Sequence, residues 1–331
     1  VPALLAGCAV LLKPSELTPL FVEPLAASIA AVPELAGVLR IVTGGPETGR
    51  AVIEQVDAVC FTGSVRTGRE VARQAADRFI PAFLELGGKD PAIVCASADL
   101  DVATSALLWG STANAGQSCM SIERVYVARE VARRFTELLV EKADLVTLDR
   151  AGDGSGQVSR FIDPRQAVVV TEHLADAVAR GATVRSGGEV EGTADGALFL
   201  PPTVVTGVDH TMRIMTEETF GPVIPVMAVE SAAQAVEYAN STSYGLSAAV
   251  FGGQDEALQI ARQLEAGGIS VNDVCLTGMV PVGEKQAFKL SGLGPSRMGP
   301  ASVARFVRRR IALVREEPRR QPWWYDGQAA S

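Results

Sequence analysis

Cys119 is the side chain of this 331-residue sequence with the surroundings best suited to nucleophilic chemistry. It ends residues 114–119 (NAGQSC), a small polar loop between a predicted helix and a predicted strand. A thiolate in such a loop can meet solvent and backbone N–H donors. The other cysteines stand in apolar, strand-like contexts, which are typical of small buried hydrophobic residues. They are Cys8, Cys60, Cys95 and Cys275.

A second candidate for chemistry is the carboxylate of Glu85, which lies upstream of Cys119. Glu85 ends an apolar predicted strand and is followed by Gly87 and Gly88. The residue is therefore expected at the carboxyl edge of a sheet, where ligands bind in open α/β folds. An isolated glutamate at such a place is usually a surface carboxylate. The two glycines favour a functional interpretation, because they let the backbone approach another group closely.

The elements that must position these residues alternate between strands and helices. Strands are predicted at residues 9–12, 37–42 and 58–61 and near Phe83 and Ile93, with helices at 19–31, 47–55 and 66–76. This alternation predicts a Rossmann-type parallel α/β sheet. Beyond Gly88 we expect helices at 102–112, 130–145, 165–180, 232–240 and 255–266, strands at 125–127 and near Thr183, and loops at 149–159 and 187–196. We predict a first domain at 1–87, a second α/β domain at 88–300, and a C-terminal segment at 301–331 whose end, from Pro318 to Ser331, is an extended arm.

Composition excludes several classes of protein. The net charge is −8, which argues against non-specific nucleic-acid binding, and no apolar run of about 18 residues predicts a membrane span. The five cysteines are widely spaced without a C-x-x-C pair, so neither a disulfide framework nor a metal site is indicated. Only two histidines are present, so a catalytic site of the Cys-His or Ser-His-Asp type is not favoured. No signal peptide is visible in the sequence, and we expect a cytoplasmic protein.

Two segments resemble the signature segments of the aldehyde dehydrogenase superfamily. They are residues 84–89 (LELGGK) and 116–119 (GQSC). Four further blocks agree in order and spacing: 13–16 (KPSE), 61–64 (FTGS), 217–223 (EETFGPV) and 291–294 (SGLG). The resemblance runs from about residue 1 to about residue 312. It implies a first domain that binds the cofactor and a second domain that is catalytic.

The resemblance also implies roles for single residues. Cys119 attacks the carbon of a small aldehyde, and Glu85 is the general base that activates water to release the acid. The site must then favour the thiolate of Cys119. The cofactor is NAD, with NADP possible, and its expected ligands are Lys13, Glu16, Ser64, Gly87, Glu218 and Phe220. Ser64 is also a plausible helix N-cap. Asn114, Gln117 and Arg124 match family positions that we interpret as structural.

Departures from the family pattern keep alternatives open. The first residues of the sequence are typical of the interior of a domain, so we expect a fragment. This fragment lacks the family's upstream Trp-Asn pair. We therefore expect it to have little activity by itself. The family's Pro-Phe-Gly-Gly-x-Lys segment is altered at residues 283–289 (GEKQAFK), which leaves the substrate open. A CoA-acylating semialdehyde dehydrogenase is one alternative, although such enzymes commonly lack the glutamate. An inactive remnant with a binding or structural role is another. The intact parent is expected to be a homo-oligomer.

Overall fold

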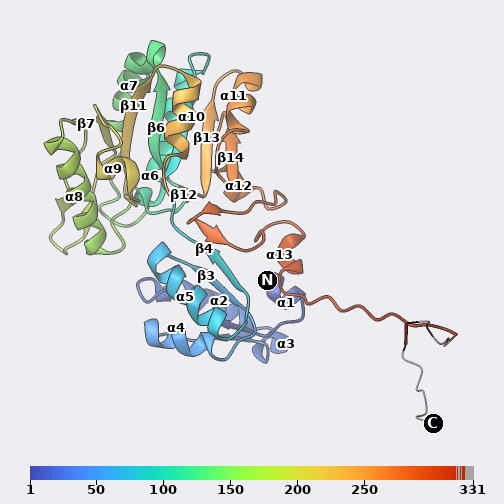
Figure 1. Ribbon diagram of the computed structural model, residues 1–331. Helices are drawn as coiled ribbons and strands as arrows, with labels where there is room; N and C mark the ends of the chain where they lie inside the picture. Colours follow the sequence, from blue (N-terminus) through green and yellow to red (C-terminus); the bar gives the residue numbers. More distant parts are fainter. Residues whose placement is uncertain (318, 320, 322, 325–331) are drawn as a thin grey trace, which may run out of the picture.

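The computed structural model describes residues 1–317, 319, 321, 323 and 324, which form two α/β units that lie one above the other (Figure 1). The first unit is coloured blue to teal except for its orange-red strand from residues 292–293, and the second unit is coloured teal-green to orange. The chain passes between them after β4 (Ala82–Glu85) and before β5 (Asp90–Val94), which belong to different sheets. The predicted α/β class with parallel sheets is confirmed.

The first unit contains a parallel pair, β1–β2, and a three-stranded sheet in the order β16–β4–β3. The predicted elements are present, with ends that differ by a few residues. The exception is the helix predicted at 19–31, which is divided, because Pro24 has no N–H to bond the Leu20 carbonyl. The elements are α1 (Pro2–Leu5), β1 (Val10–Leu12), η1 (Pro19–Phe21), α2 (Val22–Ala30), α3 (Pro33–Ala36), β2 (Leu39–Ile41), α4 (Pro46–Ile53), β3 (Val59–Thr62), α5 (Val65–Asp77) and β16 (Gly292–Leu293).

The second unit is built on a seven-stranded sheet in the order β14–β13–β5–β6–β11–β10–β7, in which only β7 runs antiparallel to its neighbour. The loop predicted at 187–196 contains a short strand, β8, which forms a hairpin with β9. The elements are α6 (Leu100–Thr112), η2 (Ala113–Gly116), β6 (Ile122–Ala128), α7 (Arg129–Ala143), α8 (Pro164–Ala179), β7 (Thr183–Ser186), β8 (Glu191–Gly192), β9 (Leu198–Phe199), β10 (Thr203–Thr206), α9 (Arg213–Thr216), β11 (Val223–Val229), α10 (Ala232–Asn240), β12 (Tyr244–Gly245), β13 (Ser247–Phe251), α11 (Gln254–Ala261), β14 (Gly268–Val271) and α12 (Leu276–Met279).

Helices cover both faces of this sheet, so its central strands are buried on both sides. In β5, Ala92 and Val94 pack into the cluster formed with α6 and α7, whereas Ile93 packs into the cluster formed with α8, α10 and α11. Successive side chains of a strand point to opposite faces, which explains this division. The run of buried apolar residues is typical of parallel sheets covered by helices.

The chain then returns to the first unit. Strand β15 (Phe288–Lys289) pairs with β12, and β16 pairs antiparallel with β4, so that Gly292 lies opposite Glu85. A Cβ atom at Gly292 would lie 2.5 Å from the Leu84 carbonyl oxygen, so the close pairing requires glycine. The return brings the altered segment 283–289 to the junction of the two units.

The C-terminal part begins with α13 (Ala301–Ala304), which packs beside α1. Residues 307–317 then run away from the two units (Figure 1). The arm predicted from Pro318 to Ser331 falls largely outside the described residues, which include only 319, 321, 323 and 324 of it. In the described part of the chain, every helix is too short or too polar to cross a membrane.

Candidate active site

Three consecutive residues of the Cys119 loop have positive φ angles, which are uncommon for residues other than glycine. Asn114, Ala115 and Gly116 have φ values of 54°, 56° and 68°, in the left-handed region. A Cβ atom at Gly116 would lie 2.3 Å from the carbonyl carbon of Gly221, so glycine is required at this contact. The loop that carries Cys119 is therefore packed directly against the loop that carries Glu218.

Gln117 fixes this loop from inside the protein. Its amide nitrogen donates to the carbonyl oxygens of Asn114 and Arg160 at 3.0 and 3.3 Å. Its amide oxygen accepts from the Ile162 N–H at 2.8 Å. These contacts agree with the structural role predicted for Gln117, and they hold the backbone that positions Cys119.

Gly87 and Gly88 make the close approaches that the sequence suggested. The Gly88 N–H donates to the Glu218 carboxylate at 3.0 Å, and a Cβ atom at Gly88 would lie 2.3 Å from the Cys119 carbonyl oxygen. A Cβ atom at Gly87 would lie 2.5 Å from a Glu218 carboxylate oxygen. The end of β4, the Cys119 loop and the Glu218 loop thus converge on two glycines.

Glu85 ends β4, as the sequence predicted. Its carboxylate lies 3.8 Å from the guanidinium of Arg297, and about a quarter of its side chain is exposed, at 27%. Arg297 follows β16 and was not singled out from the sequence. It reaches Glu85 only because β16 pairs with β4 far along the chain.

The sequence led us to expect surroundings that favour the thiolate of Cys119. The side chains around Cys119 do not favour a thiolate, so this prediction was wrong for them. Burial raises the pKa of the Cys119 thiol, and the carboxylates of Asp90, Glu218 and Glu85 raise this pKa further. The Arg297 guanidinium is the positive group that lowers it. A further positive charge near Cys119 would oppose this rise in the pKa of the thiol.

The other cysteines have different surroundings from those expected. Cys95 is buried, as predicted, and burial raises its pKa to about 11. Cys60 is exposed on β3. Cys8 precedes β1, and Cys275 lies outside any strand, at the start of α12 with a φ of 58°. The strand-like context predicted for Cys275 was therefore wrong.

The Glu218 loop is held by a buried ion pair that the sequence did not reveal. The Lys89 ammonium lies 2.7 Å from the Glu123 carboxylate and donates to the Thr219 hydroxyl at 2.9 Å. Glu123 accepts from the N–H groups of Thr219 and Phe220 at 2.7 and 2.8 Å. These bonds hold Phe220 at a φ of 51°. Lys89 belongs to a conspicuous motif, but nothing in the local sequence pairs it with Glu123.

Burial also perturbs two carboxyl groups at this centre. It raises the pKa of Glu218 to about 7, with the Glu123 charge acting in the same direction. It raises the pKa of Asp90 to about 7, against the hydrogen bonds from Ser247. Paired shifts of this kind are more frequent at functional sites than elsewhere.

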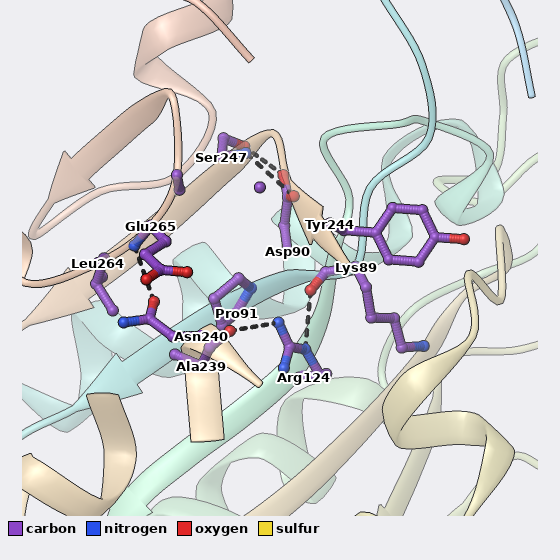
Figure 2. Close-up of a pocket in the computed structure, with 12 residues that line it drawn as sticks. Lys89, Asp90, Pro91, Arg124, Ala239, Asn240, Tyr244, Ser247, Leu264 and Glu265 are labelled. Atoms are coloured by element: carbon purple, nitrogen blue, oxygen red, sulfur yellow. Dashed lines mark hydrogen bonds between the residues drawn. The ribbon is translucent and has the colours of Figure 1, made fainter. Parts of the chain in front are cut away.

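Asp90 helps to line a small polar cavity of about 10 Å³, which is enough for one water molecule. Figure 2 shows residues that line this cavity. Asp90 accepts from the Ser247 N–H at 3.1 Å and from the Ser247 hydroxyl. The buried Arg124 donates to the carbonyl oxygens of Lys89 and Ala239 at 2.8 and 3.0 Å. These contacts join β5, β6 and α10, which agrees with the structural role predicted for Arg124.

The remaining predicted cofactor ligands lie on the first unit. Lys13 and Glu16 follow β1 and form an ion pair at 3.3 Å. Ser64 follows β3 and caps α5, where its hydroxyl accepts from the Thr67 N–H at 3.3 Å, so the predicted N-cap is confirmed. A backbone hydrogen bond and the hydrogen bond from Lys13 lower the pKa of Glu16, and the positive charge of Arg165, at the start of α8, lowers this pKa slightly further.

Comparison with known proteins identifies families and structures that this chain resembles. The family model described as "Aldehyde dehydrogenase family" matches residues 1–311. A solved structure from Anabaena variabilis, provisionally named an aldehyde dehydrogenase, is 54% identical with a TM-score of 0.95, over 98% of this chain and 69% of that one. A betaine aldehyde dehydrogenase variant from Staphylococcus aureus, solved with NAD+, is 30% identical with a TM-score of 0.91, over 98% and 67%.

The curated relatives of this chain also carry the names of dehydrogenases, and they are longer than this chain. A protein of Mycolicibacterium smegmatis, provisionally named a succinate-semialdehyde dehydrogenase [NADP(+)], is 42% identical over 82% of this chain and 53% of its own length. The 3,6-anhydro-alpha-L-galactose dehydrogenase of Streptomyces coelicolor is 41% identical over 95% and 64%. The chain thus spans between half and two thirds of the length of these relatives. The resemblance inferred from the sequence is confirmed, and the chain belongs to the aldehyde dehydrogenase family.

Proposed function

We propose that the protein containing these residues oxidises an aldehyde to a carboxylic acid with NAD(P)+, with Cys119 as nucleophile and Glu85 as general base. The observation that carries this proposal is the convergence of the two residues: Cys119 packs its carbonyl against Gly88, three residues after Glu85. Family membership supplies the reaction class, and the geometry supplies the two reactive groups.

In the first half of the reaction, the proton of the partly exposed Cys119 thiol passes to water, and the sulfur bonds to the aldehyde carbon. The carbonyl oxygen becomes an oxyanion, which needs hydrogen-bond donors in place. Among the described residues, the Cys119 backbone N–H donates no other hydrogen bond and is available for this oxygen. When bound, NAD(P)+ supplies the hydride acceptor and a positively charged ring, and loss of the hydride leaves a thioester on Cys119.

In the second half, Glu85 accepts a proton from water as the water oxygen bonds to the thioester carbon. The carbon–sulfur bond then breaks, the carboxylic acid leaves, and Cys119 is ready for another cycle. Glu85 fits this task because its side chain is partly exposed, and water can reach it. The Arg297 guanidinium at 3.8 Å helps to hold its carboxylate in place.

The residues present fit a nicotinamide dinucleotide. One oxygen of Glu218 accepts from the Gly88 N–H, which leaves its other oxygen to accept from a ribose hydroxyl. Lys13 and Glu16 offer a donor and an acceptor for a second ribose. The N-terminus of α5, capped by Ser64, suits a pyrophosphate. We propose NAD as the preferred cofactor, since Glu16 would repel a 2′-phosphate.

The experiment is an assay of NAD(P)H formation by the full-length protein with a panel of aldehydes. Cys119→Ala should abolish activity, whereas Cys60→Ala, at an exposed cysteine of the first unit, should retain it. NAD(P)H formation that requires CoA would favour a CoA-acylating enzyme instead. No NAD(P)H from any aldehyde would overturn the proposal and favour a binding or structural role. The named relatives differ in their substrates, so their names do not select an aldehyde.

A further inference from the structure

Residues 283–285, the first part of the segment where the sequence departs from the family pattern, line a cavity of about 350 Å³. Gly268, Leu276, Thr277, Val280 and Lys285 line it. Its wall is therefore largely apolar, with one positively charged side chain, Lys285, and one negatively charged side chain, Glu284. Ligand pockets commonly have this character, with a few polar groups that orient the ligand.

Lys285 is half-buried and has weak partners. Its ammonium donates to the Thr277 hydroxyl at 3.2 Å and lies 3.6 Å from the Met120 sulfur. In the described part of the chain, no carboxylate forms an ion pair with it. Burial lowers the pKa of Lys285, although the charges of Asp90 and Glu85 oppose that change. An ammonium that has lost part of its hydration, without an anionic partner, can bind one from a ligand.

The cavity adjoins the nucleophile through Met120, the residue after Cys119. Met120 packs against α12, where a Cβ atom at Gly278 would lie 2.4 Å from the Met120 methyl group. The Cys275 thiol lies 3.6 Å from the Met120 carbonyl oxygen. The Lys285 ammonium lies 3.6 Å from the sulfur of Met120, so it is close to the residue that follows Cys119. A short chain that begins at Cys119 can therefore reach the ammonium.

We propose that Lys285 binds the carboxylate of an aldehyde acid, a short aliphatic aldehyde with a carboxylate at its other end, while the aldehyde carbon lies at Cys119. This inference rests on the proposed function and assigns its substrate class. Glu284 also borders the cavity, but one of its oxygens accepts from the Ala301 N–H at 2.7 Å, which directs that carboxylate towards α13. Lys285 is thus the charged group of the wall with capacity for an anion.

The kinetic test compares 4-oxobutanoate and 5-oxopentanoate with pentanal, an uncharged aldehyde of similar length. In the full-length protein, Lys285→Met should lower kcat/KM for the oxo acids by about tenfold to a hundredfold, mainly through KM, the usual effect of losing a hydrogen bond to a charged group. Pentanal should change by less than about threefold, and Lys285→Arg should retain part of the preference. Arg133→Met, which removes a positive charge from a side chain of α7 that is 90% exposed, is the matched control. An equal loss for both kinds of aldehyde, or no loss for the oxo acids, would overturn the proposal.

A second measurement does not depend on turnover. Succinate or glutarate should slow the alkylation of Cys119 by iodoacetamide in the unmodified protein, and Lys285→Met should remove that protection. If protection is present but no aldehyde is oxidised, the proposed function fails and the anion subsite stands. If aldehydes are oxidised but neither dicarboxylate protects Cys119 in a Lys285-dependent way, the anion subsite is wrong.

Discussion

The guanidinium of Arg297 lies 3.8 Å from the carboxylate of Glu85 and is also the positive group that lowers the pKa of Cys119. Arg297 comes from the segment after β16, and Glu85 ends β4, so the pairing of these two strands creates the relationship. One arginine therefore acts on both proposed reactive groups. Its two effects can be separated by measuring alkylation of the thiol and turnover independently.

Arg297→Met should raise the pH at which Cys119 becomes reactive. Removing a nearby positive charge makes the thiolate less favourable, so the pKa of Cys119, which burial already raises, should move further up. The measurement is the rate of iodoacetamide alkylation of the Cys119 peptide between pH 6 and pH 10. Arg308→Met, at an exposed position, should leave the profile unchanged. A midpoint that stays the same or falls in the Arg297 variant would contradict the electrostatic role.

Gly88→Ala should impair activity by displacing the nucleophile. The new methyl group would lie 2.3 Å from the Cys119 carbonyl oxygen, a backbone atom that can move only with its loop. We expect a loss of about 1–3 kcal/mol in stability and a fall in kcat of about a hundredfold. Gly192→Ala, whose methyl group would meet only the Leu198 side chain at 3.7 Å, is the control. Parental kcat in Gly88→Ala would show that this contact does not position Cys119.

The sequence predicts local features of this protein well. Ser64 capping α5 and Glu85 ending β4 both follow from short patterns of residues. It does not predict the contacts made between distant segments. The strand β16 has two residues and no periodicity, so its partner β4, and with it the position of Arg297, could not be inferred.

Electrostatics was the least predictable part of the site. The carboxylates that raise the pKa of Cys119 come from Asp90, Glu218 and Glu85, on three separate segments. The ion pair between Lys89 and Glu123 is equally non-local. A local motif indicates which residues are reactive, but the packing of distant segments sets their charge states.

Glu16→Gln should narrow the preference for NAD over NADP. The Glu16 side chain is 54% exposed and its carboxylate is paired with Lys13, so the repulsion of a 2′-phosphate by Glu16 is screened. We expect the ratio of kcat/KM for the two cofactors to change by about threefold to tenfold, consistent with about 1 kcal/mol for an exposed charge. Glu23→Gln, on the surface of α2, should leave the ratio as it is. Equal use of both cofactors by the unmodified protein would refute the assignment of Glu16.

Asp90→Asn should flatten the dependence of stability on pH. The pKa of Asp90 is about 7 in the folded protein against 3.8 ordinarily, so folding favours the protonated carboxyl. Its contribution to stability is therefore fully present below about pH 4 and is lost as pH rises to 7. Asparagine keeps an acceptor for the Ser247 N–H without a charge. From urea unfolding at pH 5 and pH 8, we expect the loss between these values to be smaller in the variant by on the order of 1–4 kcal/mol.

The comparison for Asp90→Asn is Glu34→Gln, at an exposed carboxylate, which should leave the pH dependence of unfolding unchanged. An identical loss of stability between pH 5 and pH 8 in Asp90→Asn and in the unmodified protein would show that Asp90 is not protonated in the folded state.

The most direct test of the account is to trap the thioester on Cys119. Glu85→Gln removes the proposed base and should slow its hydrolysis by about 10²–10⁴. The full-length variant, incubated with NAD+ and a substrate aldehyde, is then analysed by mass spectrometry before and after digestion. The account predicts one NADH per protein in a first turnover, together with an acyl group on the Cys119 peptide that hydroxylamine removes. An acyl group on another cysteine, or undiminished steady turnover with none on Cys119, would contradict it.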